Sequence, residues 1–118
     1  MMKELDYINK LAALWPTEGE TSGEALALAD EAVRTYPNSA KLWCMRGDLI
    51  QLGSEDISYS LEDALACYEK AVSIDPNFAE GHEEIGHFCD AVIPNPTRAR
   101  RAFREAARIR QARISNET

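Results

Sequence analysis

Apolar residues recur along this chain at spacings of three and four, which is the spacing of one face of an α-helix. Three stretches share this pattern with a small residue in the middle: Ile8-x2-Leu11-Ala12-x2-Trp15, Trp43-x2-Arg46-Gly47-x2-Ile50 and His82-x2-Ile85-Gly86-x2-Cys89. Each is followed by a second stretch: Ala25-x3-Ala29-x2-Ala32, Ala64-x3-Tyr68-x2-Ala71 and Ala99-x3-Phe103-x2-Ala106. No stretch alternates with the period of a strand, so the pattern predicts an all-α protein.

Proline and capping residues divide the pattern into six helices. Pro16 closes the first helix, and Pro37 and Pro76 break the chain between units. Thr21-x2-Glu24 and Ser60-x2-Asp63 are typical of capping boxes, and Asn95-Pro96 of a cap followed by proline in the first turn. The predicted helices span 3–15, 23–35, 40–52, 61–74, 78–92 and 96–114.

The chain also repeats itself. A shift of 39 residues brings nine identities into register between positions 24 and 47 and positions 63 and 86, and a third copy follows once small gaps are allowed. The small residues Ala12, Gly47 and Gly86 predict a close approach of the second helix in each unit. We therefore expect one domain over residues 1–118, built of three helical hairpins at about 5–38, 40–78 and 79–112.

The repeated pattern resembles the tetratricopeptide repeat, W-x2-L-G-x2-Y followed by A-x3-F-x2-A and a proline. The middle unit matches best, through Trp43, Gly47, Ala64, Tyr68, Ala71 and Pro76. Arg46 stands where leucine is usual, His82 stands where a bulky aromatic is expected, and the stretch Gly53–Ser60 adds five residues. The longer unit is also similar to Sel1-like repeats, but Asp75-Pro76-Asn77 at the boundary favours the tetratricopeptide family.

This resemblance implies a right-handed superhelical stack of three hairpins, whose first helices line a concave groove that takes up a peptide or helix of a partner protein. The groove positions lie about 130° around each first helix from its packing stripe, at roughly 100° per residue. They hold Asp6, Asn9, Ala13, Lys41, Cys44, Asp48, Gln51, Glu80, Glu83, His87 and Asp90. Five acids and one lysine predict a neutral or basic partner segment, although these acids could instead form a plain solvated face.

The same resemblance excludes one well-known ligand of the family. Some tetratricopeptide proteins grip the acidic tails of heat-shock chaperones through a carboxylate clamp of Lys, Asn and Arg. At those positions this chain has Asn9, Ala13, Met45, Glu80 and Glu84. None matches the clamp and two have the opposite charge, so binding of a carboxylate-terminated chaperone tail is not expected.

Charge is distributed unevenly along the chain. Residues 1–96 carry 6 basic and 18 acidic side chains, whereas residues 97–118 carry 7 arginines and 2 glutamates. The acidic body and the lack of aromatic residues between the arginines weigh against nucleic-acid binding. The arginines are expected to offset the acidic repeats, within the chain or in a weak homodimer with possible contacts at Arg101, Arg108, Ile109 and Ile114.

Candidate chemistry is sparse. His82 and His87 are five apart, so on one helix their rings point about 140° away from each other and do not share a metal ion. Cys44, Cys67 and Cys89 have no CxxC spacing and fit reduced thiols. We expect no catalytic residue, metal or cofactor, no signal peptide or membrane span, and a cytoplasmic protein.

Three functions follow from these observations. The leading one is a protein-interaction module, such as an adaptor, scaffold or small chaperone. The alternative is a structural protein that forms homo-oligomers through its arginine-rich last helix. An enzyme, or an inhibitor that occludes one, is the third.

Overall fold

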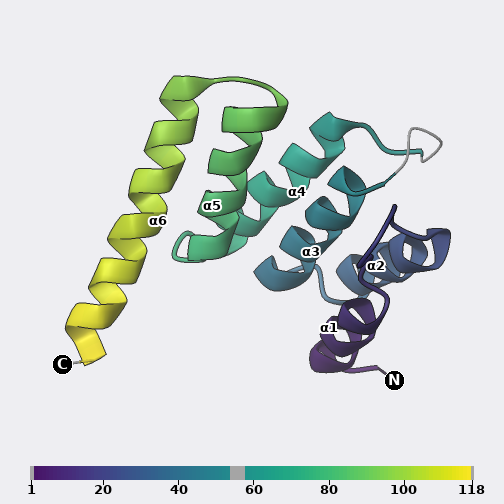
Figure 1. Ribbon diagram of the computed structural model, residues 1–118. Coiled ribbons are helices and arrows are strands. Elements are labelled where there is room, and N and C mark those ends of the chain that lie inside the picture. Colours follow the sequence, from purple (N-terminus) through teal and green to yellow (C-terminus); the bar gives the residue numbers. More distant parts are fainter. Residues whose placement is uncertain (1, 54–57, 118) are drawn as a thin grey trace.

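Six helices follow one another as an arch of packed hairpins (Figure 1). The computed structural model describes residues 2–53 and 58–117, and within these ranges it contains no strand. The helices are α1 (Glu4–Ala13), α2 (Gly23–Thr35), α3 (Ala40–Gln51), α4 (Leu61–Ile74), α5 (Ala79–His87), the π-helical continuation η1 (Phe88–Val92) and α6 (Pro96–Glu117). The predicted all-α fold is confirmed. When η1 is counted with α5, each predicted helix is present, and its ends lie within three residues of the predicted ones.

Two of the three predicted helix starts are confirmed. The backbone N–H of Ser60 donates to Asp63 Oδ2 at 2.8 Å, and the N–H of Arg98 donates to Asn95 Oδ1 at 3.2 Å. The capping box predicted at Thr21 is wrong, because the cap of α2 is the next residue, Ser22, whose Oγ accepts a hydrogen bond from the N–H of Ala25. The Thr21 hydroxyl donates instead to the Leu49 carbonyl at 2.7 Å, so it fastens the α1–α2 connection to α3.

Close helix packing in the second and third hairpins depends on their glycines. A Cβ atom at Gly47 would lie 2.7 Å from a ring carbon of Tyr68, and one at Gly86 would lie 2.7 Å from a ring carbon of Phe103. Each glycine therefore lets the aromatic residue of the second helix cross directly over the first helix. The predicted close approach is confirmed at both positions.

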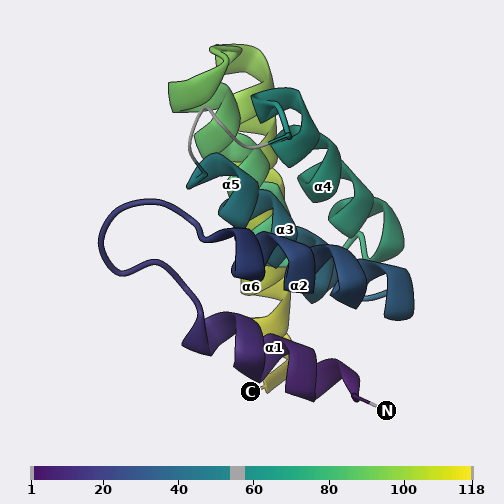
Figure 2. The same ribbon diagram turned by 90° about the vertical axis from the view of Figure 1, so that its right-hand side faces the viewer.

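The first hairpin packs differently. Ala12, the third small residue, is exposed, and the fully buried residues of α1 are Tyr7 and Leu11. The expected close approach at Ala12 is therefore wrong, because α1 is turned to place Tyr7 against α2. Figure 2 shows the α1–α2 connection as a wide loop that leaves the body of the protein.

Polar contacts, rather than a close helix crossing, hold the start of α1. The Tyr7 hydroxyl donates to Glu31 Oε2 at 2.9 Å, and the Tyr36 hydroxyl donates to the Met2 carbonyl at 2.8 Å. Ser39 donates to a Glu4 carboxylate oxygen at 2.6 Å. These bonds tie α1 to the last turn of α2 and to the α2–α3 turn.

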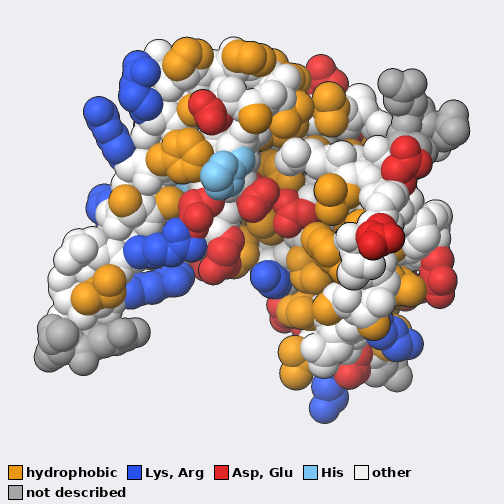
Figure 3. All heavy atoms as spheres, viewed as in Figure 1, with side chains coloured by type: hydrophobic (Ala, Val, Ile, Leu, Met, Phe, Trp, Pro, Cys, Tyr) orange, Lys and Arg blue, Asp and Glu red, His pale blue; other side chains and the backbone are white. Residues whose placement is uncertain are grey.

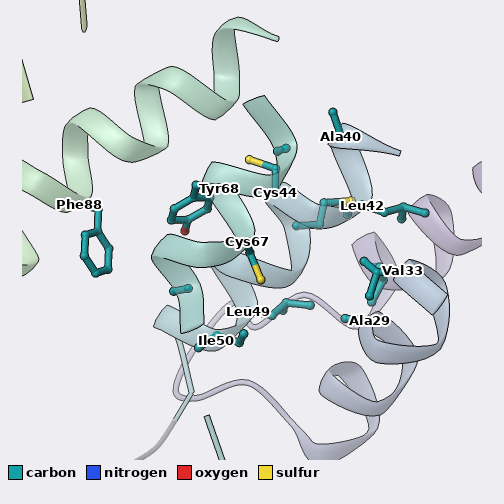
Figure 4. Close-up of a cluster of buried hydrophobic side chains, with 14 of the residues drawn as sticks. Ala29, Val33, Ala40, Leu42, Cys44, Leu49, Ile50, Cys67, Tyr68 and Phe88 are labelled. Atoms are coloured by element: carbon teal, nitrogen blue, oxygen red, sulfur yellow. The ribbon is translucent and has the colours of Figure 1, made fainter. Parts of the chain in front are cut away.

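A continuous core runs from α2 through α3 to α4 and η1, as Figure 4 shows with Val33, Leu42, Tyr68 and Phe88. Tyr68 and Ala71 are fully buried in this core, whereas Trp43 and Phe103 are half-buried and pack against it. All three cysteines are buried and unpaired.

Arg46, the departure from the usual leucine, joins three helices. Its Nε lies 2.8 Å from Asp30 Oδ1 of α2, and an Nη donates to Cys67 Sγ of α4 at 2.9 Å. The guanidinium also lies 4.8 Å from the ring centre of Tyr59. Tyr59 belongs to the long link in the second unit. Residues 54–57 of that link lie outside the described residues.

Candidate functional site

The inner side of the arch is the candidate site. It is bounded by α1 at one end and α6 at the other, with α3 in contact with both α1 and α5 between them (Figure 1). Figure 3 shows this side hollowed, with acidic side chains gathered around a histidine and basic side chains on the α6 arm. The first helices therefore present a concave, mainly acidic surface.

Two adjoining depressions lie on this surface near the C-terminal end of α1. One, of about 300 Å³, is lined by Ala12, Trp15, Lys41, Met45 and Asp48. The other, of about 230 Å³, is lined by Trp15, Asp48, Gln51, Leu52 and Glu84. Because Trp15 and Asp48 line both, we refer to the two together as the Trp15 hollow.

A pair of carboxyl groups lies in the Trp15 hollow. Asp48 of α3 lies close enough to Glu84 of α5 to raise the pKa of that carboxyl, and Asp48 accepts a hydrogen bond from the Tyr68 hydroxyl at 2.7 Å. Gln51 in turn donates to the Tyr68 oxygen at 2.7 Å. The buried Tyr68 side chain thus fixes the position of Asp48 from beneath.

The surroundings of Glu84 leave its carboxyl partly protonated near neutral pH. Burial raises the pKa of Glu84, the neighbouring Asp48 adds to the shift and Lys41 opposes it, and together they bring this pKa to about 7. Burial also raises the pKa of the Tyr68 hydroxyl, with the charge of Asp48 adding to the effect. Tyr68 therefore remains a neutral hydrogen-bond donor to Asp48.

The predicted groove residues fall into three groups. Lys41, Asp48 and Gln51 line the Trp15 hollow. Exposed positions elsewhere are Asn9, Ala13, Glu80, His87 and Asp90, and His87 packs edge-on against Phe103 with ring centres 5.0 Å apart. The remaining three, Asp6, Cys44 and Glu83, are engaged within the chain.

Cys44 is a correction to the predicted surface. It is only 4% exposed, and burial raises the pKa of its thiol, with the nearby carboxylate of Asp48 adding to the shift. It lies under the groove rather than in it. Asp6 accepts the N–H of Lys3 at 2.8 Å at the start of α1, and Glu83 forms an ion pair with Arg110 of α6.

Sequence reasoning missed part of the hollow. Trp15 and Ala12 belong to the stripe of the first helix that is predicted to pack, and Leu52 is not among the predicted groove residues. Met45 and Glu84 are predicted only as positions of the carboxylate clamp. Among the five clamp positions, Asn9, Ala13, Met45, Glu80 and Glu84, none carries a cation.

The histidines have separate surroundings. His82 Nε2 lies 2.9 Å from the Pro76 carbonyl, in the turn between α4 and α5, whereas His87 lies against α6. Within the described residues, no three His, Cys, Asp or Glu side chains gather as a metal site. No helix of the described chain has the length and apolar content needed to span a membrane.

The C-terminal arginines contact acids of this same chain. Arg98 pairs with Glu69 of α4 at 2.6 Å, Arg110 pairs with Glu83 of α5, and Arg108 pairs with Glu105 one turn earlier. Arg101 is exposed. The expectation that Ile109 offers an oligomer contact is corrected, because Ile109 is only 3% exposed, whereas Ile114 is 56% exposed.

Stacked helical hairpins with an extended inner surface define a class of protein that binds other proteins. The TPR repeat family model matches residues 60–88, the second helix of the middle hairpin and the first helix of the next. The chain is also similar to the anaphase-promoting complex subunit CDC27 of Saccharomyces cerevisiae, with 35% identity over 86 residues, 73% of this chain and 10% of that protein. No solved structure matches the chain significantly.

The chain belongs to the tetratricopeptide repeat family and is a protein-interaction module. It spans about a tenth of the length of the curated relative that it matches.

Proposed function

We propose that this chain, as one domain of three repeats (about 5–38, 40–78 and 79–112), binds a neutral or basic segment of a partner protein on its concave face. The observation that carries this proposal is the Trp15 hollow, which combines an aromatic wall with two carboxyl groups. An aromatic side chain next to unpaired acidic groups is typical of surfaces that take up a peptide. An adaptor or scaffold role in the cytoplasm fits such a surface.

Charge on the inner side supports a basic segment. Glu80 and Asp90 are exposed on the face of α5 and η1 that also carries His87, and Asp48 and Glu84 lie between α3 and α5. Complementary charge speeds the encounter of two proteins and selects among partners. A terminal carboxylate would meet the same acids and be repelled.

The curated relative supports binding to protein rather than to a small molecule. CDC27 of Saccharomyces cerevisiae is named as a subunit of a complex, and the similarity covers 73% of this chain. A repeat stack leaves extended surfaces for such contacts. We therefore favour another protein over a substrate.

Fluorescence anisotropy with two labelled dodecapeptides tests the proposal, one alternating Lys and Ala and the other alternating Glu and Ala. The basic peptide is expected to bind and the acidic one is not. Replacing Glu80 and Glu83 together by Lys is expected to weaken binding about tenfold, since it reverses two charges and releases Arg110 from its ion pair.

A matched variant distinguishes the effect of charges in the groove from the effect of the net charge of the protein. Glu24→Lys with Glu62→Lys changes the net charge equally but on α2 and α4, the second helices of their hairpins. Binding is expected to fall much less in this variant. Equal losses in both double variants would contradict the groove and leave only general electrostatic attraction.

A weak homodimer through α6 stays a second candidate. The exposed Ile114 and the exposed Arg101 favour it, because α6 thereby offers both an apolar side chain and a cation to an acidic partner surface. The burial of Ile109 leaves this surface smaller than expected.

A further inference from the structure

The Trp15 hollow has apolar walls and an acidic floor. Trp15, Leu52 and Ala12 supply apolar surface, while Asp48 and Glu84 supply two carboxyl groups. Leu52 is 43% exposed, so this wall is open to a ligand. Lysine and arginine side chains have the same division, with an apolar stem and a charged head.

The carboxyl pair has no cation of its own. Within the described residues, neither Asp48 nor Glu84 forms a salt bridge, although Lys41 lies close enough to influence Glu84. Other half-buried acids of this chain do have a cationic partner: Asp30 pairs with Arg46, and Glu83, the neighbour of Glu84, pairs with Arg110. Asp63, another half-buried acid of the described chain, accepts the backbone N–H of Ser60 at the start of α4, which leaves the Asp48–Glu84 pair for an external cation.

The pair is also held in place before any ligand arrives. The Tyr68 hydroxyl fixes Asp48, and Gln51 fixes that hydroxyl. Tyr68 itself is fully buried, so this support cannot move independently of the core. Groups that are already positioned lose less conformational entropy when a ligand binds.

Resting on the function proposed above, we propose that the Trp15 hollow is the subsite for one lysine or arginine side chain of the partner. The stem of that side chain packs against Trp15 and Leu52, and its charged head lies between the carboxylates of Asp48 and Glu84. A guanidinium head can also stack on the indole ring.

This subsite makes binding depend on pH. A bound cation favours two ionised carboxylates, so the proton on Glu84 passes to solvent when the head enters. With the pKa of free Glu84 at about 7, affinity rises by up to about tenfold between pH 6 and pH 8.

Other polar and charged groups surround Glu84, and their effects on the pH dependence must be distinguished from that of Glu84. Asp48, Lys41 and Cys44 face it from α3, and Tyr68 stands behind Asp48 on α4. His87 lies one turn further along α5, and Arg110 of α6 meets the adjacent Glu83. Because His87 lies so near to Glu84 on the same helix, its replacement serves as a separate control.

Nuclear magnetic resonance of the full ¹⁵N-labelled chain tests the subsite with four blocked heptapeptides, Gly-Ser-Ala-X-Ala-Ser-Gly, in which X is arginine, lysine, citrulline or norleucine. The arginine and lysine peptides are expected to shift the indole N–H signal of Trp15. They should leave that of Trp43 unchanged, since its Nε1 donates to the Pro37 carbonyl. The uncharged citrulline and norleucine peptides are expected to bind at least about tenfold more weakly.

Two variants and one control locate the effect. Trp15→Ala and Glu84→Gln are each expected to lower the affinity for the charged peptides about five- to tenfold, and Glu84→Gln removes the pH dependence. His87→Gln keeps the pH dependence. The remaining backbone signals of each variant report that it is folded.

Specific results would overturn the subsite. Citrulline binding as well as arginine, an unshifted Trp15 signal with bound peptide, or an unchanged pH dependence in Glu84→Gln would each do so. The alternating Lys and Ala dodecapeptide distinguishes this failure from that of the proposed function. If it still binds and responds to the Glu80 and Glu83 changes, only the subsite is wrong; if it does not bind, the groove itself is wrong.

Discussion

The first hairpin and the later two reach the same fold through different contacts. In α3–α4 and α5–α6, a glycine of the first helix lies directly beneath an aromatic ring of the second, Tyr68 or Phe103. In α1–α2, the residue at the matching position, Ala12, is exposed and lines the Trp15 hollow. Two repeat units can therefore share a sequence pattern although the same position is buried between helices in one and exposed in the other.

This difference produces the candidate site. Because α1 is held by Tyr7 and Leu11, the end of that helix leaves Trp15 half-buried beside Asp48. In the tightly packed second hairpin, the buried Tyr68 holds Asp48 in position by a hydrogen bond. The orientation of the α1–α2 hairpin therefore determines the shape of the hollow, and the α3–α4 hairpin holds its carboxylate in place.

The largest effect is expected at the centre of the second hairpin. Tyr68→Ala removes a fully buried ring and two hydrogen-bond partners, so the free energy of unfolding should fall by about 3–5 kcal/mol. Urea melts measure it. A loss below about 1 kcal/mol would show that Tyr68 does not fill the inter-helix core.

Enlarging the small residue of each hairpin tests the comparison directly. Gly47→Ala and Gly86→Ala place a Cβ against a ring and should each cost about 1–3 kcal/mol, although alanine is the better helix former. Ala12→Gln is the matched change in the first hairpin, and it should stay within about 0.5 kcal/mol. Equal costs at the three positions would remove the distinction between the hairpins.

Loss of the α2 cap should have a smaller effect. Ser22→Ala removes the acceptor for the Ala25 N–H and is expected to destabilise the protein by about 1 kcal/mol. Glu24→Gln at the second residue of α2 is the control, because the cap of this helix is Ser22 and Glu24 forms no capping box with Thr21. Thermal melts of the two variants should differ, and a larger loss for Glu24→Gln would reinstate the Thr21 box.

The carboxyl pair should make stability depend on pH. The folded-state pKa of Glu84 is raised from 4.5 to about 7, so its protonated form stabilises the fold below about pH 4.5, and this contribution is lost as pH rises through 7. Glu84→Gln resembles the protonated form. The two proteins should agree at low pH, and above pH 7 the variant should be more stable by on the order of 1 kcal/mol, since water screens a half-exposed carboxylate. Urea melts across pH 4–8 measure the difference, and parallel curves would contradict it.

The smallest effect is expected at the end of α6. If the weak homodimer forms, Ile114→Glu should abolish it, and added salt should weaken it by screening the arginines. Sedimentation at two salt concentrations measures the association. A monomer at every concentration up to hundreds of micromolar in the unchanged protein would exclude the dimer.

The arginines of α6 also explain why this outer face is polar. In the alignment of Ala64-x3-Tyr68-x2-Ala71 with Ala99-x3-Phe103-x2-Ala106, Leu65 corresponds to Arg100 and Val72 to Ala107. Val72 lies close to Gly81 of the following helix, whereas Ala107 is exposed. The apolar surface that receives the next hairpin after α4 is thus largely replaced by charge on α6.

The six helices, their order in hairpins and the close crossings at Gly47 and Gly86 could all be predicted from the sequence. These features depend on spacing, capping and side-chain size within one unit, which are local properties. For the same reason the capping box at Ser60 and the cap at Asn95 were predictable. Asp48 and Gln51 lie on the inner side of α3, as the repeat pattern implies, and their contact with a partner stays a prediction.

The orientation of α1 and the residues that it exposes depend on long-range contacts, which the sequence pattern does not predict. The residues that hold α1, such as Glu31, Tyr36 and Ser39, lie about 30 residues away in sequence, and turning a helix about its axis changes no local hydrogen bond. The same applies to Glu83, which pairs with Arg110, and to Glu84, which meets Asp48 across two helices. Which carboxylates remain available to a partner is therefore set by long-range packing, because only the folded chain determines which of them meet a cation.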